Sequence, residues 1–347
     1  MAKRNSDRKV RVGVIGLGMG RWHIEQYKKH PQADVTALCD VDEKRLADAA
    51  TKFEVPHTFT DPRKLIKSGL VDVVSIATPN TLHAPLTIDA LKAGLHVLCE
   101  KPMAMNAAQA QKMVDAAKAA KRKLAINYSH RLTPNVQAMG RYIAAGDIGK
   151  AYFARTVWHR RRGIPGRQSF VTKNFSGGGC LIDLGVHIID IALYCLGFPK
   201  VLSVTGQTYM KFDKLDVPKL KMEVDDFATA YIRCEGDITL AVEVSWASHH
   251  TPGEEMTTAI YGTNGGVFRQ IGQDWKPQIT VSRREHGNLV TTKLDSFADV
   301  PSPPQDLINA VLENRQPAAS GEHGLLLMKI LDAIYKSSAT GKEVIVK

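Results

Sequence analysis

Apolar residues in the first part of the chain fall in short, nearly continuous runs that alternate with longer amphipathic stretches. The short runs predict buried strands at 10–15, 35–39, 71–77, 95–99 and 123–127. The amphipathic stretches predict helices at 21–29, 43–53, 81–93 and 107–120. Strands that alternate with helices of this length are typical of a parallel sheet with crossover helices. We therefore predict an α/β nucleotide-binding domain over residues 8–127.

The pattern changes after about residue 127, where strands become more frequent. They are expected at 152–158, 201–209, 227–234, 238–246 and 257–261. Turn residues separate these closely spaced strands, which fits a mostly antiparallel sheet. Helices are expected at 134–145, 180–196, 304–314 and 321–340. We therefore predict a second, sheet-based domain over residues 128–347.

The composition is that of a folded protein with an excess of basic residues. The chain has 347 residues, of which 44% are hydrophobic, and this suffices for the cores of two domains. The net charge is +11, but the basic residues are dispersed apart from short runs at 121–123 and 160–162. The simplest interpretation of the first run is a solvated surface. We expect no nucleic-acid partner, because no nucleic-acid-binding motif is present and the charge is not concentrated along one helix.

The sequence predicts a cytoplasmic protein that does not enter a membrane. Residues 1–9 are charged and lack the apolar stretch of a secretory signal. No run approaches the roughly 18 apolar residues of a membrane helix. The five cysteines form no C-x-x-C pair, which fits reduced and buried thiols; they are Cys39, Cys99, Cys180, Cys195 and Cys234. No metal site is expected.

A glycine-rich turn follows the first predicted strand. Gly16, Gly18 and Gly20 would let the backbone approach a pyrophosphate, at which the next helix points its free N–H groups. Asp40 ends the second strand, where a carboxylate accepts hydrogen bonds from ribose hydroxyls and repels a 2′-phosphate. The turn is one residue shorter than the strict G-x-G-x-x-G, since position 21 is Arg21, so we expect Gly20 to replace the third glycine. These residues predict a dinucleotide site that prefers NAD over NADP; the alternative is an ordinary tight turn.

Two further motifs follow predicted strands, at the edge where ligands bind in open α/β sheets. The first is the segment 78–80, with His83 after it. The second is Glu100-Lys101-Pro102, in which the proline holds Lys101 extended. A lysine beside a cofactor can polarise a substrate oxygen. The alternatives are that Thr78 or Asn80 only caps a helix, and that Lys101 is an exposed surface lysine.

A fourth motif begins at three glycines, residues 177–179, and reads as a helix from there. Asp183 and His187 are four residues apart and would share one helix face, with Asp190 nearby. Such a polar stripe is costly to bury on an otherwise apolar helix. The alternative is a core histidine whose hydrogen bonds are satisfied.

These motifs occur in order along the chain, as a glycine-rich turn, T-P-N-x-x-H, E-K-P and G-G-G-x-L-x-D-x-G-x-H-x-x-D. Together they resemble the Gfo/Idh/MocA family, named for glucose–fructose oxidoreductase, inositol dehydrogenase and a rhizopine-catabolism protein. The resemblance spans nearly the whole chain, including the ending at 333–344. It implies a Rossmann domain followed by a C-terminal α/β domain with an open, mostly antiparallel sheet. It also implies that the last helices, about 304–340, pack back toward the first domain.

An oligomer is expected as well, because the open sheet face commonly forms subunit contacts in the family. An uncovered sheet of this size would expose apolar surface and unpaired edges. We therefore predict a homodimer or a homotetramer.

The resemblance assigns site residues by matching motifs. Lys101 takes the family's catalytic lysine position, and Asp183 and His187 take its aspartate–histidine pair. The peptide bond between Lys101 and Pro102 can be cis in relatives. The cofactor-binding residues expected are Gly16, Gly18, Met19, Gly20, Asp40, Thr78, Pro79, Asn80, His83, Glu100 and Lys101.

The implied function is hydride transfer between NAD and a secondary alcohol carbon of a sugar, a cyclitol or a sugar derivative. His187 would accept the alcohol proton, since histidine titrates near neutral pH. Lys101 would bond to the same oxygen, and Asp183 would orient the imidazole or bind a neighbouring hydroxyl. Two alternatives remain open. One is a glycoside-processing enzyme that retains NAD and oxidises a ring hydroxyl transiently, and the other is a non-catalytic NAD-binding regulator.

The run Arg160-Arg161-Arg162 precedes a turn indicated by Gly163, Pro165 and Gly166. We expect at least one of the three arginines to contact substrate hydroxyls or a carboxylate, for which a guanidinium is suited. The alternative is a loop that only pairs with acidic residues across a subunit contact.

Overall fold

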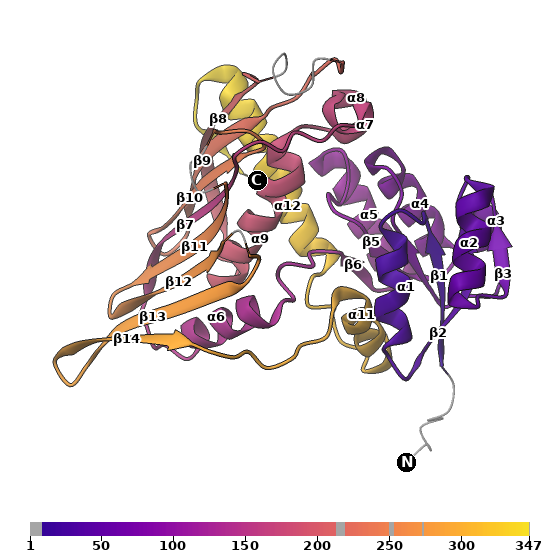
Figure 1. Cartoon of the computed structure of the whole chain (residues 1–347), viewed down its shortest axis with the longest axis horizontal. Helices are drawn as coiled ribbons and strands as arrows, with labels where there is room; N and C mark the ends of the chain where they lie inside the picture. The colour runs from indigo at the N-terminus through magenta and orange to yellow at the C-terminus, as the bar shows by residue number, and fades with distance from the viewer. Residues whose placement is uncertain (1–8, 213–218, 250–252, 273, 347) are drawn as a thin grey trace. The chain divides into compact units, whose positions relative to one another are not determined.

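The structure is a computed structural model that describes residues 9–212, 219–249, 253–272 and 274–346. It divides into two compact units, whose elements are labelled in Figure 1. The first unit consists of the described residues up to Ser129 together with Pro301–Leu326. The second consists of His130–Val300 and the described residues from Leu327 onward. Residues 1–8, on which the argument against a secretory signal depends, lie outside the described residues.

The first unit contains a six-stranded sheet with the order β3-β2-β1-β4-β5-β6. Its strands are β1 (Val10–Ile15), β2 (Ala33–Cys39), β3 (His57–Phe59), β4 (Val73–Ile76), β5 (His96–Cys99) and β6 (Leu124–Ile126). Every pair is parallel, which confirms the predicted parallel sheet. The strand order reverses between β1 and β4, and this reversal is the topological switch point of a Rossmann-type fold.

Helices pack on this sheet, and α1 to α5 also connect its strands. They are α1 (Gly20–Lys28), α2 (Glu43–Phe53), α3 (Pro62–Ile66), α4 (Asn80–Lys92), α5 (Ala107–Ala120) and α11 (Pro303–Leu312). Asp42 and Asn106 cap α2 and α5 with their side chains, as the sequence pattern favours. The N-cap of α4 is Pro79 and makes no side-chain cap hydrogen bond, so the alternative that Thr78 or Asn80 only caps this helix finds no support. Leu307 and Ile308 of α11 belong to the same hydrophobic core as β1 and α1.

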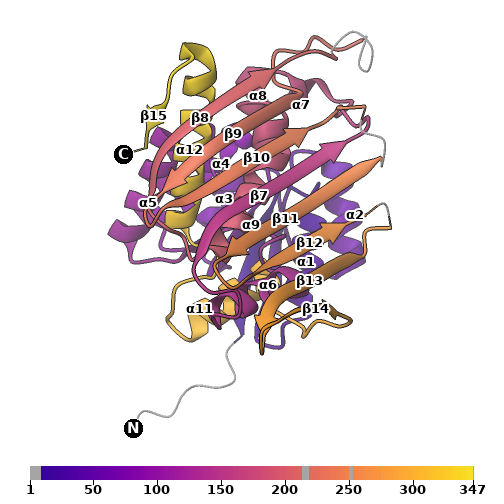
Figure 2. The ribbon, with the colours of Figure 1, turned by 90° about the vertical axis from the view of Figure 1, so that its left-hand side faces the viewer.

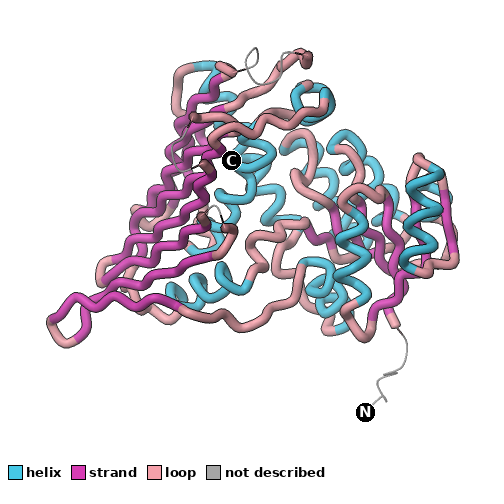
Figure 3. The backbone as a smooth tube through the Cα atoms, viewed as in Figure 1, coloured by secondary structure: helices cyan, strands magenta, loops and turns pink. Residues whose placement is uncertain are grey.

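The second unit contains a nine-stranded sheet with the order β14-β13-β12-β11-β7-β10-β9-β8-β15. Its strands are β7 (Ala151–Arg160), β8 (Val201–Tyr209), β9 (Phe227–Cys234), β10 (Ile238–Ser245), β11 (Glu254–Gly262), β12 (Gly265–Ile271), β13 (Pro277–Glu285), β14 (Asn288–Leu294) and β15 (Val344–Ile345). They form one continuous sheet (Figure 3). Of the pairs between described strands, β7 with β10 is parallel and the others are antiparallel, so the sheet is mostly antiparallel as predicted.

Helices pack on one face of this sheet. They are α6 (Pro134–Ala144), α7 (Gln168–Val171), α8 (Lys173–Ser176), η1 (Leu181–Gly185), α9 (Val186–Cys195) and α12 (Gly321–Thr340). Helix α9 contacts β7, β10 and β11, and α6 contacts β12 and β13. No described helix covers the opposite face, which is turned toward the viewer in Figure 2.

The helix predicted at 180–196 is not a regular α-helix. Its first part, η1, is a π-helix, and the α-helix α9 begins only at Val186. The regular α-helix predicted from residue 180 is therefore wrong at its start, where a π turn closes over five residues. That Asp183 and His187 share one helix face stays a prediction. Single π turns inside helices are frequent at functional sites.

One helical run among the described residues, Lys173–Cys195, is long and apolar enough to span a membrane, with a mean hydropathy of 1.5. The sequence analysis predicted no such run. In the structure 89% of its most apolar window is buried, as it is in the core helix of a globular unit.

Candidate active site

The glycine turn after β1 leaves room for a ligand at one glycine only. A Cβ atom on Gly16, whose φ is +88°, would overlap the carbonyl oxygen of Ala77. A Cβ on Gly20 would lie 2.8 Å from Cγ1 of Val14, so Gly20 allows α1 to pack closely on β1. A Cβ on Gly18 would meet nothing within 4 Å. The protein therefore requires Gly16 and Gly20 for its own packing, whereas the space beside Gly18 is available to a ligand.

The start of α1 adds backbone donors beside this turn. Its N-cap is Met19, which makes no side-chain cap hydrogen bond, and the first turn of α1 contains no acidic residue. The N–H groups of a first helical turn have no partner within the helix and favour a bound anion. A pyrophosphate suits both this helix end and the space beside Gly18.

Asp40 follows β2 and is buried beside the same turn. Its Oδ2 accepts a hydrogen bond from the Leu17 amide at 2.7 Å, and its Oδ1 accepts one from the Asp42 amide at 2.9 Å. Arg45 places Nη1 3.3 Å from both oxygens. Asp40 therefore holds the glycine turn in place and also forms an ion pair with Arg45.

The segment after β4 lies against the glycine turn. A Cβ on Gly16 would lie 3.0 Å from the amide nitrogen of Thr78. The Thr78 hydroxyl is buried and has no hydrogen-bond partner in the described part of the chain. A buried hydroxyl without a partner is costly unless a ligand or a water molecule bonds to it.

His83 connects the loops that follow β4 and β5. Its Nε2 lies 2.9 Å from the Thr78 carbonyl, and its Nδ1 lies 2.7 Å from the Pro102 carbonyl. Burial lowers the pKa of His83, although hydrogen bonds to the two carbonyls act in the opposite direction. Because a main-chain carbonyl lies beside each ring nitrogen, His83 joins the two loops. Its expected contact with the cofactor stays a prediction.

The residues after β5 form a buried polar network. Glu100 Oε1 lies 2.9 Å from His23 Nε2 and accepts a hydrogen bond from Asn127 Nδ2 at 2.6 Å. Glu100 Oε2 accepts a hydrogen bond from the Lys101 amide at 3.0 Å. The Lys101–Pro102 peptide bond is cis. The carboxylate of Glu100 thus has two side-chain partners, His23 and Asn127, that the sequence analysis did not identify. Its expected contact with the cofactor stays a prediction.

In the second unit, Asp183 and His187 lie in well-packed surroundings. Asp183, in η1, accepts a hydrogen bond from Nε1 of Trp246 at 3.0 Å. The buried ring of His187 lies at centroid distances of 4.6 Å from His130 and 6.1 Å from Trp158. These three partner residues were not expected, because each is far from the motif in sequence.

Asp190, the third polar residue of this motif, has a different environment. It pairs with Arg131, whose Nε donates to Asp190 Oδ2 at 2.9 Å. Both side chains are fully buried, and the Arg131 guanidinium lies 4.7 Å from the ring centroid of Phe198. Asp190 therefore neutralises a buried arginine, which accounts for its place on an apolar helix.

A buried carboxylate anchors the start of η1. Asp225 accepts hydrogen bonds from the amides of Gly179 and Leu181, both at 2.9 Å, and from the Tyr335 hydroxyl at 2.7 Å. A Cβ on Gly179 would overlap the Asp225 backbone. Position 179 therefore requires glycine, because the Asp225 backbone leaves no room for a side chain. No local sequence signal identifies Asp225.

The run of three arginines is not a single loop element. Arg160 ends β7, where its Nε donates to Glu254 Oε1 at 3.1 Å and its guanidinium lies 5.7 Å from the Trp158 ring centroid. Arg160 is therefore engaged by residues of its own chain. Arg161 and Arg162 are exposed.

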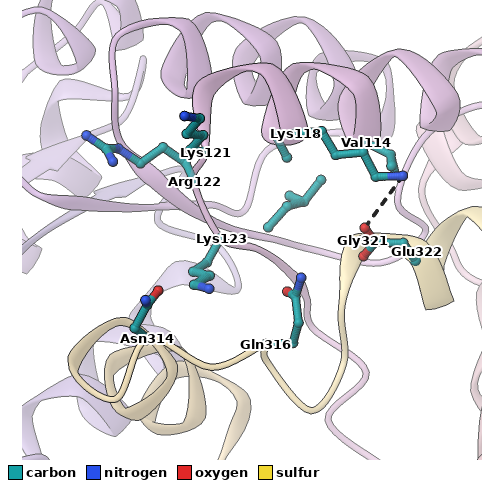
Figure 4. A pocket seen from close by; sticks show the side chains of 11 residues that line it. Val114, Lys118, Lys121, Arg122, Lys123, Asn314, Gln316, Gly321 and Glu322 are labelled. Atoms are coloured by element: carbon teal, nitrogen blue, oxygen red, sulfur yellow. Dashed lines mark ion pairs between the residues drawn. The ribbon is translucent and has the colours of Figure 1, made fainter.

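A pocket of about 250 Å³ lies in the first unit, between the end of α5 and the segment that leads into α12 (Figure 4). It is lined by Val114, Ala117, Lys118, Lys121, Arg122, Lys123, Leu124, Asn314, Gln316, Gly321 and Glu322. Leu124 begins β6, so the pocket lies at the opposite end of the sheet from Asp40 and Lys101. It therefore contains none of the residues expected to bind cofactor or substrate.

The cysteines and possible metal ligands are the remaining candidates for chemistry. The five cysteines are free and buried, and burial raises the pKa of Cys39 to about 12 and that of Cys234 to about 11. Such thiols stay protonated and unreactive at neutral pH. Among the described residues, no group of three or more His, Cys, Asp or Glu side chains is arranged to hold a metal ion.

Comparison with known proteins agrees with this geometry. Residues 10–128 match the model of the "Oxidoreductase family, NAD-binding Rossmann fold", and residues 136–268 match the "GFO/IDH/MocA C-terminal domain". D-glucoside 3-dehydrogenase of Escherichia coli is 30% identical over 96% of this chain and 97% of its own length. Myo-inositol 2-dehydrogenase of Thermotoga maritima is 27% identical over 94% of this chain and 96% of its own.

A solved structure is also similar over nearly the whole chain. Levoglucosan dehydrogenase, in complex with NADH and levoglucosan, has a TM-score of 0.88 and 25% identity, and the match covers 98% of this chain and 100% of that one. The matched family models together span more than half of the chain. The chain therefore belongs to the Gfo/Idh/MocA family of NAD-binding oxidoreductases.

Proposed function

We propose that this chain is an NAD-dependent dehydrogenase that moves a hydride between nicotinamide and a secondary alcohol carbon of a sugar, a cyclitol or a sugar derivative. The observation that carries the proposal is the carboxyl edge of the sheet in the first unit. The glycine turn follows β1, Asp40 follows β2 and Lys101 follows β5, around the point where the strand order reverses. Dinucleotides bind at this point in doubly wound sheets.

The residues around the turn fit NAD. The space beside Gly18 and the N–H groups at the start of α1 would take the pyrophosphate. The carboxylate of Asp40 would accept the adenosine ribose hydroxyls. The buried Thr78 hydroxyl would donate its hydrogen bond on the nicotinamide side. When bound, NAD supplies the acceptor for the hydride.

The side chains of the chain itself supply the proton chemistry. His187 accepts the proton of the substrate hydroxyl, and Lys101 donates a hydrogen bond to the same oxygen and, as a cation, lowers its pKa. Asp183, held by the Trp246 indole, orients the imidazole or binds a neighbouring hydroxyl. These roles rest on the family motifs that contain the three residues.

The substrate class rests on the relatives. Their names specify a D-glucoside, levoglucosan, myo-inositol and D-apiose. The test is a panel of methyl glucosides, levoglucosan, myo-inositol and D-apiose with added NAD, read by NADH absorbance. We expect NADH formation with at least one compound. NADH binding without turnover of any compound would overturn the proposal in favour of a non-catalytic regulator.

The same panel separates the proposal from a glycoside-processing enzyme that retains its NAD. That alternative predicts NAD that copurifies with the protein and is reduced by a glycoside once, with no net reduction of added NAD. A steady increase in NADH absorbance with protein stripped of nucleotide contradicts it.

The second unit would also form an oligomer through its uncovered sheet face. Tyr231 and Phe268 are exposed on β9 and β12, whose alternate residues are buried, and Tyr261 is exposed near the end of β11. Light scattering should detect a homodimer or a homotetramer, and the double substitution Tyr231→Glu/Tyr261→Glu should dissociate it. A monomer at working concentration would refute the assembly.

Arg161 and Arg162, which are exposed, remain candidates for a substrate contact. Single alanine substitutions should raise KM for the substrate while the assembly stays intact. Unchanged kinetics in both variants would remove the candidates.

The cytoplasm is the proposed location, supported by five free and buried cysteines. Cell fractionation with a cytoplasmic marker enzyme tests this location.

A further inference from the structure

The buried network behind Lys101 extends from the carboxyl edge of the sheet into the centre of the first unit. His23, on α1, places Nε2 2.9 Å from Glu100 Oε1 and Nδ1 3.1 Å from Ser75 Oγ. The Ser75 hydroxyl lies 2.9 Å from the Tyr27 hydroxyl. His23, Ser75 and Tyr27 are fully buried, and Glu100 is 7% exposed. The network therefore meets the site only at Glu100.

The protons of this network can be assigned from its partners. An ionised carboxylate only accepts hydrogen bonds, so His23 donates from Nε2 to Glu100. The Ser75 hydroxyl lies between His23 Nδ1 and the Tyr27 hydroxyl, at 3.1 Å and 2.9 Å. Burial alone would raise the pKa of Glu100, but His23, the Asn127 amide and the charge of Lys101 outweigh it and lower that pKa.

The far end of the network, at Tyr27, is fully buried. Burial raises the pKa of the Tyr27 hydroxyl far above its ordinary value, so Tyr27 stays protonated at any pH at which the enzyme works. A chain of hydrogen bonds that ends on a buried, un-ionised phenol does not deliver protons to a reaction. Its effect on the site is geometric.

That geometric effect falls on Lys101. Three donors hold the Glu100 carboxylate inward, and one of them is the Lys101 amide. Because Glu100 Oε2 accepts from the Lys101 amide at 3.0 Å, a carboxylate held inward also fixes the backbone from which the Lys101 side chain starts. We infer that His23 and Glu100 are positioning residues that set the direction from which the Lys101 ammonium group reaches the substrate oxygen. This inference rests on the proposed role of Lys101.

Substitution of Glu100→Gln tests it with little change in shape. The carboxylate accepts from three groups, whereas an amide has one oxygen and presents N–H groups to the remaining donors. We expect kcat to fall at least tenfold with the substrate identified by the panel, while the Kd for NADH changes less than threefold. The matched control is Tyr27→Phe, which removes the last hydroxyl of the network but leaves the contacts of Glu100, and its kcat should stay within twofold of the parent value.

A double-mutant cycle separates positioning from a general loss of structure. If Glu100 acts through Lys101, Glu100→Gln should cost less than twofold in kcat once Lys101→Ala is present. If Glu100→Gln lowers kcat by the same factor with and without Lys101→Ala, the inference is overturned. If Lys101→Ala alone keeps the parent kcat, the proposed function of the lysine has failed, and this outcome is distinct from failure of the positioning role.

Hydrogen exchange gives a measurement that needs no substrate. The Lys101 amide donates to Glu100 Oε2, so Glu100→Gln should accelerate exchange in a peptide that spans residues 96–102. Tyr27→Phe should leave this peptide protected. Unchanged exchange in Glu100→Gln, together with a parent-like kcat, would overturn the positioning role.

Discussion

Trp246 donates its indole N–H to the carboxylate of Asp183 at a distance of 3.0 Å. The tryptophan is fully buried, and its own amide donates to the Asp226 carbonyl at 2.8 Å, so the donor has a fixed position. The two residues are far apart in sequence, and the motif that identified Asp183 contains no sign of Trp246. This bond orients the carboxylate that we assign to the imidazole or to a substrate hydroxyl.

Trp246→Phe should therefore lower kcat/KM by about tenfold or more. A hydrogen bond to a charged group contributes roughly 1.5–3 kcal/mol, and about 1.4 kcal/mol corresponds to one factor of ten. Steady-state kinetics with the panel substrate measure the effect. The control is Trp275→Phe, an exposed tryptophan whose substitution should leave kcat/KM unchanged. Parent-like kinetics in Trp246→Phe would mean that the bond does not contribute to catalysis.

Gly18→Ala and Gly16→Ala should have opposite consequences. At Gly18 the added methyl meets no protein atom within 4 Å, so the fold should persist while NADH binding weakens at least tenfold. At Gly16 the methyl overlaps the Ala77 carbonyl, and we expect a large loss of thermal stability. Gly146→Ala is the control, because its φ is +83° and nothing lies nearby, so it should cost only about 1 kcal/mol. Unaltered NADH affinity in Gly18→Ala would contradict the assigned pyrophosphate position.

NAD should be preferred over NADP in kcat/KM, because the carboxylate of Asp40 repels a 2′-phosphate. Asp40→Ser should shift the preference toward NADP, since it removes the carboxylate that repels a 2′-phosphate and leaves the Arg45 guanidinium paired with Asp42 alone. Arg45→Ala should increase the preference for NAD. The control is Arg63→Ala, at an exposed arginine paired with Asp89. It should change neither kcat/KM for NAD nor kcat/KM for NADP. A kcat/KM for NADP equal to that for NAD in the parent protein would refute the prediction.

Lys101→Ala and His187→Ala should each lose turnover while still binding NADH. Loss of a general acid or base costs about 10²–10⁴ in rate. NADH affinity, measured by nucleotide fluorescence, should stay close to that of the parent. Exposed residues of the same types provide the controls, namely Lys92→Ala and His57→Ala. Near-parent kcat in either site variant would reject that residue's role, and a chelator should leave the activity of the parent protein intact.

Stability should decrease as pH falls from about 6.5 to about 4, in part through His96. Burial, followed by the charges of Arg122 and Lys123, lowers the pKa of His96 from 6.5 to about 4. The unfolded chain then takes up a proton in this window that the folded chain does not, so the free energy of unfolding falls with pH. Protonation of Nδ1 would also break its bond with the Lys123 amide, at 2.9 Å.

The contribution of His96 should be about 1 kcal/mol, less than the full pKa difference implies, because the ring is only partly buried. His96→Gln keeps an acceptor for the Lys123 amide but does not titrate. Thermal unfolding from pH 4 to 7 should therefore depend less on pH in His96→Gln than in His57→Gln, the exposed control. If the unfolding temperature depends on pH with the same slope in the two variants, His96 does not contribute to the loss of stability at low pH.

A strong hydrophobic periodicity was sufficient to predict the strands and helices that form both cores. The predicted strand 10–15 and the helices 43–53 and 107–120 agree with β1, α2 and α5 residue for residue. Weak patterns failed for a physical reason. The edge strand β3 is short and mostly exposed, and β13 and β14 contain few apolar residues. Neither a continuous apolar run nor a long apolar–polar alternation therefore distinguishes these strands from loops.

The motifs that bear chemistry were also visible in the sequence, because backbone constraints mark them. A turn that needs a φ of +88° selects glycine at Gly16, and the end of β2 places Asp40 beside it. These are local properties, set by a few neighbouring residues. They determined the fold class, the cofactor and the residues proposed for catalysis.

The tertiary structure alone decided how the charged groups of those motifs are paired. Glu100 turns inward to His23, Asp183 receives the Trp246 indole, and Asp190 neutralises Arg131. The partners in these pairs are 77, 63 and 59 residues apart in sequence. No local pattern selects such partners, because a buried charge is stabilised by whichever donor the folded chain brings within hydrogen-bond distance.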